Sequence, residues 1–250
     1  MVISQHSSPQ SVISRSESGW NLEIPPGKSS QYRLAQLDDY ASLKRSDFIH
    51  QTSAVLSLRA RASNNSIPGT WGFGFWNDPF STIMGQGGMA RSFPVLPNAA
   101  WFFYGSQDNY LSFRNDKPSN GFLAATFSSP QTPTILLTPA IVMSPLLLFK
   151  SSAKWIRHQL SRRILEDSAL LEIDVTEWHE YKIRWENNLV SFEVDGSKLL
   201  VTTVSPKCPL GLVIWIDNQY AAFQPSGKIK TGTLENPVPA WIEIENLIIF

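Results

Sequence analysis

The sequence predicts an all-β fold: a jelly-roll sandwich of two antiparallel sheets, with one inserted helix near residues 145–167. The first observation is a series of short runs in which apolar and polar residues alternate. The second is the set of Gly, Pro and Asn turns between them. The third is that helical spacing appears in a single stretch. The chain has 250 residues with 9 Trp and 14 Phe, which is enough to fill a large core.

Residues 1–19 are rich in Ser and Gln and poor in large apolar residues. This composition predicts a flexible N-terminal lead-in. We expect regular structure to begin near Trp20 and residues 20–250 to form a single jelly-roll domain.

Several strands are expected in the first half. Residues 53–63, SAVLSLRARAS, alternate with Leu56, Leu58 and Ala60 on one face. The turn sequence NNSIPG precedes TWGFGFWN. Further strands are predicted in NAAWFFYGS, NYLSFR and GFLAATF.

The strongest pattern covers residues 178–204, which open with WHEYKIRW. Tyr181, Ile183 and Trp185 share one face of a predicted strand. Turns are expected at residues 187–188 and at 195–196, where Asp-Gly favours a two-residue hairpin. This stretch predicts a three-stranded antiparallel meander. LGLVIWIDN and WIEIENLIIF predict later strands.

Residues 144–168 have helical spacing instead. Ile156, Leu160 and Ile164 recur every fourth residue, and Ser144-Pro145 suits a helix start. The opposite face carries five basic side chains: Lys150, Lys154, Arg157, Arg162 and Arg163. Either this face is solvated on a helix covering the sandwich, or it docks an acidic protein partner.

Charge and composition exclude several classes of function. Lys and Arg together number 21, as do Asp and Glu, so no charge surplus indicates a nucleic-acid partner. The most apolar stretch, residues 134–149, is broken by Pro139 and Pro145 and is short for a membrane span, so we expect no membrane insertion. We expect a buried strand followed by a helix start there instead.

A single cysteine, Cys208, and no visible signal peptide predict a cytoplasmic protein, or a secreted one if a leader was removed. The sequence does not indicate an oligomeric state.

Three stretches resemble a known family. TEWHEYKIRWENNLVSFEVDG resembles the WHxYxIxW…VxFxVDG meander of concanavalin A-like sandwiches, which include family 16 glycoside hydrolases and laminin-G-like domains. WGFGFWNDPF is similar to an upstream strand of that fold. PLGLVIWIDNQYAAF and WIEIENLIIF are similar to its last concave strand and its closing strand. The resemblance covers residues 54–76 and 178–250. It implies a curved sheet with a sugar lying across its hollow.

Alternation then predicts which residues face the hollow. Leu212, Ile214 and Ile216 are expected in the core, which places Val213, Trp215 and Asp217 in the groove. Trp71, Phe73 and Phe75 are likewise expected in the core, which turns Gly72, Gly74 and Trp76 outward. The two glycines would leave room for a ligand, or for another side chain or a bend.

The resemblance also raises the question of catalysis. Family 16 enzymes carry an E-x-D-x-x-E strand, and EIDVTE matches it with Glu172 as nucleophile, Asp174 as assisting residue and Glu177 as acid/base. In the family, this strand closely follows the FW strand. Here AAWFFYGSQDNYLSF follows instead, and it contains no Glu.

No metal or cofactor motif is found, so no cofactor is expected. Calcium is not indicated, although Asp78, Asp108, Asp217 and Asn218 could coordinate it or bind sugar hydroxyls. GQGGM at 85–89 predicts a loop, and His179 is expected to be structural.

These observations favour a glycan-binding domain, non-catalytic or degenerate, whose partner is an oligo- or polysaccharide. An active retaining β-glycan hydrolase and a protein-interaction domain using the basic helix are the alternatives. The residues predicted to bind sugar are Trp76, Trp101, Tyr104, Trp215, Asp217, Asn218 and Tyr220.

Overall fold

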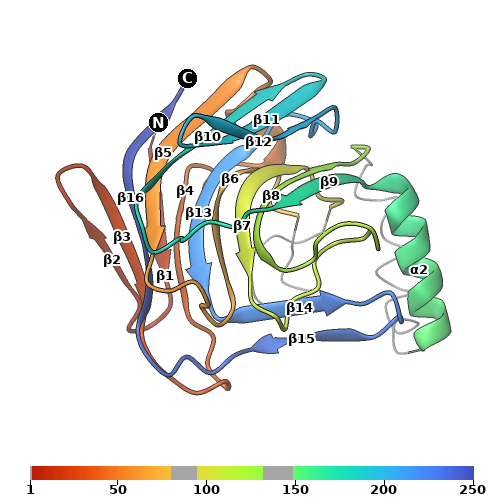
Figure 1. The fold of residues 1–250 in the computed structure, drawn as a ribbon, viewed down its shortest axis with the longest axis horizontal. Coiled ribbons are helices and arrows are strands. Elements are labelled where there is room, and N and C mark those ends of the chain that lie inside the picture. The colour runs from red at the N-terminus through yellow and green to blue at the C-terminus, as the bar shows by residue number, and fades with distance from the viewer. Residues whose placement is uncertain (1, 80–94, 132–148) are drawn as a thin grey trace.

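The computed structural model describes residues 2–79, 95–131 and 149–250, and it confirms a sandwich of two antiparallel sheets (Figure 1). Sheet A has seven strands, in the order β1 (Ser4–Ser7), β4 (Leu34–Asp38), β13 (Gly211–Asp217), β6 (Thr70–Trp76), β7 (Ala99–Gly105), β8 (Gly121–Ser128) and β9 (Leu165–Leu170). Sheet B has seven strands, in the order β12 (Ser197–Thr202), β11 (Leu189–Val194), β10 (His179–Glu186), β5 (Ala54–Ala62), β16 (Ala240–Ile249), β3 (Gly19–Ile24) and β2 (Val12–Arg15). A separate hairpin contains β14 (Gln219–Phe223) and β15 (Ile229–Thr233).

The N-terminal segment differs from the prediction of a loose lead-in. Strand β1 pairs with β4 at the edge of sheet A, and β2 pairs with β3 at the edge of sheet B. Ile3 and Ile13 pack against the core. Short edge strands are held by backbone hydrogen bonds to one neighbour, which need few large apolar side chains. The Ser-rich composition therefore concealed both strands.

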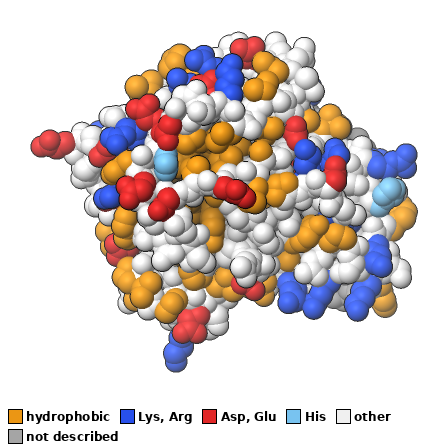
Figure 2. Space-filling model, viewed as in Figure 1, with side chains coloured by type: hydrophobic (Ala, Val, Ile, Leu, Met, Phe, Trp, Pro, Cys, Tyr) orange, Lys and Arg blue, Asp and Glu red, His pale blue; other side chains and the backbone are white. Residues whose placement is uncertain are grey.

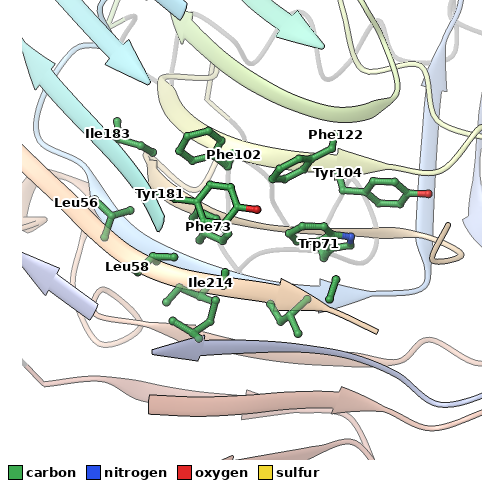
Figure 3. Packing of buried hydrophobic residues seen from close by; sticks show 14 of the residues in the cluster. Leu56, Leu58, Trp71, Phe73, Phe102, Tyr104, Phe122, Tyr181, Ile183 and Ile214 are labelled. Carbon is green, nitrogen blue, oxygen red and sulfur yellow. The ribbon is translucent and has the colours of Figure 1, made fainter. Parts of the chain in front are cut away.

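The main core fills the space between the sheets, as Figure 3 shows. Phe73 of β6 and Phe102 of β7 both contact Tyr181 of β10, with ring centroids 5.0 Å apart in each pair. Phe102 also meets Phe192 of β11 edge to face at 5.3 Å. The inward residues predicted from alternation in β5, β6, β10 and β13 are all buried here. Edge-to-face rings stabilise such a core beyond their buried area.

The predicted meander is confirmed as β10, β11 and β12. Asp195 and Gly196 both have positive φ, 49° and 76°, as the central residues of a type I′ hairpin turn require. The Asp-Gly pair therefore fixes the register that buries Val190, Phe192 and Val194.

One prediction about local structure was wrong: of residues 109–114, expected as a strand, only Tyr110 forms an isolated bridge, with Ala222. The predicted helix is confirmed as α2, Lys150–Arg163, and it ends before residue 167 because β9 begins at Leu165. The predicted helix start at Ser144-Pro145, most of the apolar stretch 134–149 and the GQGGM loop lie outside the described residues.

Two elements frame the outer face of sheet A, meaning the face turned away from sheet B. The β14–β15 hairpin runs toward α2 (Figure 1). A Cβ on its turn residue Gly227 would come within 2.4 Å of the Lys150 carbonyl oxygen, so the hairpin turn touches the helix. Ile164 and Leu160, at the other end of α2, pack against the outer face of sheet A. A single-turn 3₁₀ helix, η1 (Arg45–Asp47), lies in the β4–β5 connection.

Candidate functional site

The outer face of sheet A is the surface that the sequence pattern assigned to a ligand. Alternation places Gly72, Gly74 and Trp76 of β6 on this face, as predicted, with Trp215 of β13 beside Gly72 and Trp101 of β7 beside Gly74. The side chains from these neighbouring strands therefore meet above β6.

These side chains form the outer aromatic cluster, which we define as Trp76, Trp101, Phe103 and Trp215. The indoles of Trp76 and Trp215 are nearly parallel, 6° apart, with centroids 6.3 Å apart. Trp101 and Phe103 each lie 5.6 Å from Trp215. The cluster is a continuous aromatic layer across β13, β6 and β7.

The glycines of β6 make this layer possible. A Cβ at Gly72 would lie 2.9 Å from Cη2 of Trp215, and a Cβ at Gly74 would lie 2.6 Å from Cβ of Trp101. Both distances are too short for two carbon atoms. Of the three explanations open for the glycines, room for another side chain is therefore the one that the contacts support at Gly72, while at Gly74 the backbone of Ala100 and Trp101 comes closest, at 2.4 and 2.5 Å.

Most of the cluster is more covered than the sequence pattern suggested. Trp76 is 5% exposed and Trp215 is 8% exposed. They share a buried cluster with Tyr40, Phe48 and Ile164, which come from distant segments. Trp101 is the cluster member that remains partly exposed. Trp76 and Trp215 thus form a buried floor, and a ligand on this face would meet Trp101.

Tyr104 was wrongly assigned to this face. Its position in β7 alternates with Phe103, so its side chain points into the main core. There its ring stacks on Trp71, with centroids 5.8 Å apart. Tyr104 cannot contact a ligand on the outer face of sheet A.

Asp217 lies at the end of β13 in a buried hydrogen-bond chain. The Trp215 indole N–H donates to the Thr70 hydroxyl at 3.0 Å, and that hydroxyl donates to Asp217 at 2.7 Å. The Tyr32 hydroxyl donates to the other carboxylate oxygen at 3.4 Å. Burial raises the pKa of Asp217 to about 7, although these hydrogen bonds act against the rise. This chain holds the Trp215 indole in place.

The other two predicted polar and aromatic contacts have different roles. Asn218 is fully buried, accepts the Arg33 backbone N–H and donates to the carbonyl oxygens of Gln31 and Leu234. Its hydrogen bonds join three chain segments, which is a structural role. Tyr220 is partly exposed on β14, over Gly232.

The EIDVTE residues lie away from this face. Glu172, Asp174 and Glu177 are exposed on the segment that connects β9 to β10, and this segment is not a strand. Asp174 accepts hydrogen bonds from Asn65 at 2.8 Å and from the Thr176 hydroxyl at 2.7 Å. These bonds lower the pKa of Asp174 and fix a turn.

A second hollow was not anticipated from the sequence. A cleft of about 690 Å³ separates α2 from residues 113–116. Arg157 was predicted on a basic helix face that is either solvated or docks a partner, and it is instead buried at the wall of this cleft. Phe113 lines this cleft and also packs against the buried cluster that contains Trp76, Phe103 and Trp215. The i, i+3, i+4, i+7 spacing of Lys154, Arg157, His158 and Ser161 is the sequence signal that could have indicated it.

Within the described ranges there is no group of three or more His, Cys, Asp or Glu side chains able to hold a metal ion. Nor does that part of the chain include a helix with the length and apolar character needed to cross a membrane.

Comparison with known proteins gives a match at the level of the fold. No family model matches the chain, and no curated protein matches it by sequence. Among solved structures, the legume lectin-like domain of Entamoeba histolytica is similar over 99% of this chain and 89% of its own, with a TM-score of 0.51 and 11% identity.

Two further solved structures are similar to the same extent. LamAcat of Zobellia galactanivorans matches over 94% of this chain and 78% of its own, with a TM-score of 0.50 and 12% identity. The Bacteroides ovatus mixed-linkage glucan GH16 structure, in complex with a G4G4G3G product, matches over 100% of this chain and 94% of its own, with a TM-score of 0.50 and 8% identity. The protein therefore has the concanavalin A-like jelly-roll fold. At these identities the likeness establishes the fold and not the activity.

Proposed function

We propose that this protein binds glycan on the outer face of sheet A and does not hydrolyse it. The observation that carries the proposal is the outer aromatic cluster, with Trp101 partly exposed above a floor of buried indoles. A pyranose has an apolar C–H face that packs well on an indole, and polar groups at the rim fix its orientation. The lectin-like neighbour in structure supports this choice.

The positions of the carboxylates support the absence of hydrolysis. Strand β7 presents Trp101 and Phe103 outward and carries no Asp or Glu. Asp38 of β4 pairs with Val213, four residues from Asp217 along β13, which places the two Cα atoms roughly 13 Å apart at the usual rise per residue. Glu166 of β9 pairs with Phe127 on the same face, and β9 lies four strands from β13, roughly 19 Å at the usual strand spacing. A retaining pair needs about 5–5.5 Å and an inverting pair about 6.5–9.5 Å.

The experiment is a binding and turnover assay against a panel of neutral β-glucan oligosaccharides. We expect binding with no release of reducing ends, and loss of binding in Trp101→Ala. Trp241→Ala is the matched control, because Trp241 is also half-buried but lies in sheet B. Turnover that disappears in Glu172→Gln would establish the hydrolase alternative instead. Unchanged binding in Trp101→Ala would contradict the proposed site.

A further inference from the structure

The cleft between α2 and residues 113–116 has an unusual wall. Its four helical side chains are Lys154, Arg157, His158 and Ser161, which form one stripe along α2. Lysine and arginine are hydrogen-bond donors only, and an imidazole can also donate. The Ser161 hydroxyl donates to the His158 carbonyl oxygen at 2.9 Å, and Arg157 donates to the Ser112 carbonyl oxygen across the cleft. Lys154 and His158 are therefore the donors that this row offers to a ligand.

Nothing in the helix neutralises this row. Helix α2 contains no Asp or Glu. In the parts of the chain that are described, no carboxylate pairs with Lys154 or His158; Asp116, across the cleft, pairs with Arg114. Like charges three or four residues apart destabilise a helix, and an anion in the cleft would relieve this repulsion. Figure 2 shows Lys and Arg side chains gathered where α2 lies.

Arg157 gives the cleft a fixed positive group. Its guanidinium donates to the Ser112 carbonyl oxygen at 2.7 Å and to Asn115 Oδ1 at 3.1 Å. Its charge also lies over the rings of Tyr110 and Phe223, at 5.3 and 5.8 Å from their centroids. Burial lowers the pKa of Arg157, with partial compensation from Tyr110 and Glu166. An anion in the cleft would therefore meet a positive group that is already held in position.

We propose that this cleft binds the carboxylate or sulfate of an acidic glycan whose sugar chain continues onto the outer aromatic cluster. The inference rests on the proposed function and adds the class of glycan. A saccharide is favoured over an acidic peptide because Phe113 joins the two surfaces: it lines the cleft and packs against the buried cluster that includes Trp215.

The test uses two matched pairs of probes. One pair is an oligogalacturonate and its neutral methyl ester, and the other is a cello-oligosaccharide with and without sulfate. We expect the wild-type protein to prefer the acidic member of at least one pair, and added NaCl to weaken that binding. Which pair shows the preference distinguishes carboxylate from sulfate.

Two double variants locate the effect. Lys154→Gln/His158→Gln should weaken acidic binding about fivefold, as expected for losing one exposed charge contact and one donor, and leave neutral binding unchanged. Arg162→Gln/Arg163→Gln is the control, because these exposed residues lie on the same helix and do not line the cleft. All four side chains are exposed, so the substitutions should not disturb the core. Unfolding curves check that each variant folds.

Three results would overturn the inference. The first is equal affinity for acidic and neutral probes. The second is equal weakening by both double variants, which would indicate general attraction to a basic helix. The third is oligoglutamate binding as tightly as the acidic glycans, which would indicate a protein partner.

Two other results separate this inference from the proposed function. Binding of neutral probes that depends on Trp101, with no preference for acidic probes, would support the proposed function and contradict the inference. Binding of acidic probes that is unchanged in Trp101→Ala but weakened in Lys154→Gln/His158→Gln would support the cleft as a binding site and contradict the aromatic site.

Discussion

The ring of Trp215 lies directly over Gly72, so that its Cη2 atom is 2.9 Å from the position that a Cβ at residue 72 would occupy. The same Cβ would lie 2.4 Å from the carbonyl oxygen of Phe102, which belongs to the adjacent strand. Neither group can move freely, because Trp215 is held by the Thr70 hydroxyl and Phe102 by the sheet.

Gly72→Ala should therefore lower the free energy of unfolding by about 1–3 kcal/mol, the usual range for overpacking. Denaturant unfolding measures this change. Gly232→Ala is the matched control: its Cβ would meet the partly exposed ring of Tyr220 at 3.0 Å, and this ring can move aside. An equal effect at both positions would show that Trp215 is not the obstacle.

Asp217→Asn should change how stability depends on pH. The pKa of Asp217 is about 7 in the folded protein, against 3.8 for an ordinary aspartate. Between these values the folded state keeps a proton that the unfolded chain releases, so this group makes stability fall as pH rises from about 4 to 7, by up to about 1.4 kcal/mol per pH unit.

The asparagine variant should match the wild-type protein near pH 4 and exceed it in stability above pH 7. Urea unfolding at several pH values measures the difference between the two proteins. Asp116→Asn, at an exposed carboxylate paired with Arg114, should give no such gain. Parallel curves for wild type and Asp217→Asn would contradict the assigned role of burial.

Much of the fold, and which residues of β6 and β13 lie on the outer face of sheet A, could be predicted from the sequence. A strand needs only a period of two, so the local order of Gly72, Phe73 and Gly74 was enough to place each residue on its face. The Asp195-Gly196 turn likewise carries its own backbone preference.

What covers a face could not be predicted in this way. Trp76 and Trp215 are buried because Tyr40, Phe48 and Ile164 pack with them, and these come from the β4–β5 connection and the end of α2, which are far from both tryptophans in the chain. The alternating pattern of β6 and β13 carries no information about those contacts. Exposure of an outward residue is therefore a tertiary property.

The EIDVTE motif failed for a related reason. Its letters match a catalytic strand, and Leu171, Ile173 and Val175 alternate with the acidic residues as they would in a strand and pack on the main core. The segment nevertheless connects β9 to β10 without joining a sheet. Whether an alternating segment finds a neighbouring strand is a tertiary property, which the local pattern does not contain.

Tyr181→Phe should raise the free energy of unfolding. Tyr181 is 2% exposed, and its hydroxyl has no hydrogen-bond partner within the described ranges. An unpaired buried hydroxyl is unfavourable by about 1–3 kcal/mol, so its removal should stabilise the protein by up to that amount. Thermal unfolding measures the gain.

Tyr104→Phe provides the control for this prediction. Tyr104 is buried in the same core, but its hydroxyl is not among the buried polar atoms that lack a partner, and the pKa of Tyr104, which burial raises, is lowered in part by Ser66 and the backbone of Ile67. Its loss should destabilise the protein by about 1 kcal/mol. If both substitutions shift the midpoint in the same direction, the contrast between paired and unpaired hydroxyls is not what determines the result.

Asp195→Asn should weaken the hairpin between β11 and β12 only where the carboxylate is charged. One carboxylate oxygen of Asp195 lies 2.6 Å from His179 Nδ1, and the other accepts the Glu180 backbone N–H at 2.8 Å. Burial acts to raise the pKa of Asp195, but the contacts with Glu180 and His179 lower it overall. A lowered pKa contributes stability above about pH 4, and this contribution is lost as pH falls through the folded value. Because the Asp195 side chain is 53% exposed, we expect a loss of less than about 1 kcal/mol at pH 7 and none near pH 2. Asparagine tolerates the positive φ of this position, so the turn itself is retained.

Urea unfolding of Asp195→Asn, His179→Gln and the double variant measures the coupling between the two side chains. We expect the double variant to be no less stable than either single variant. Strict additivity of the two losses would mean that the two side chains do not act as a pair.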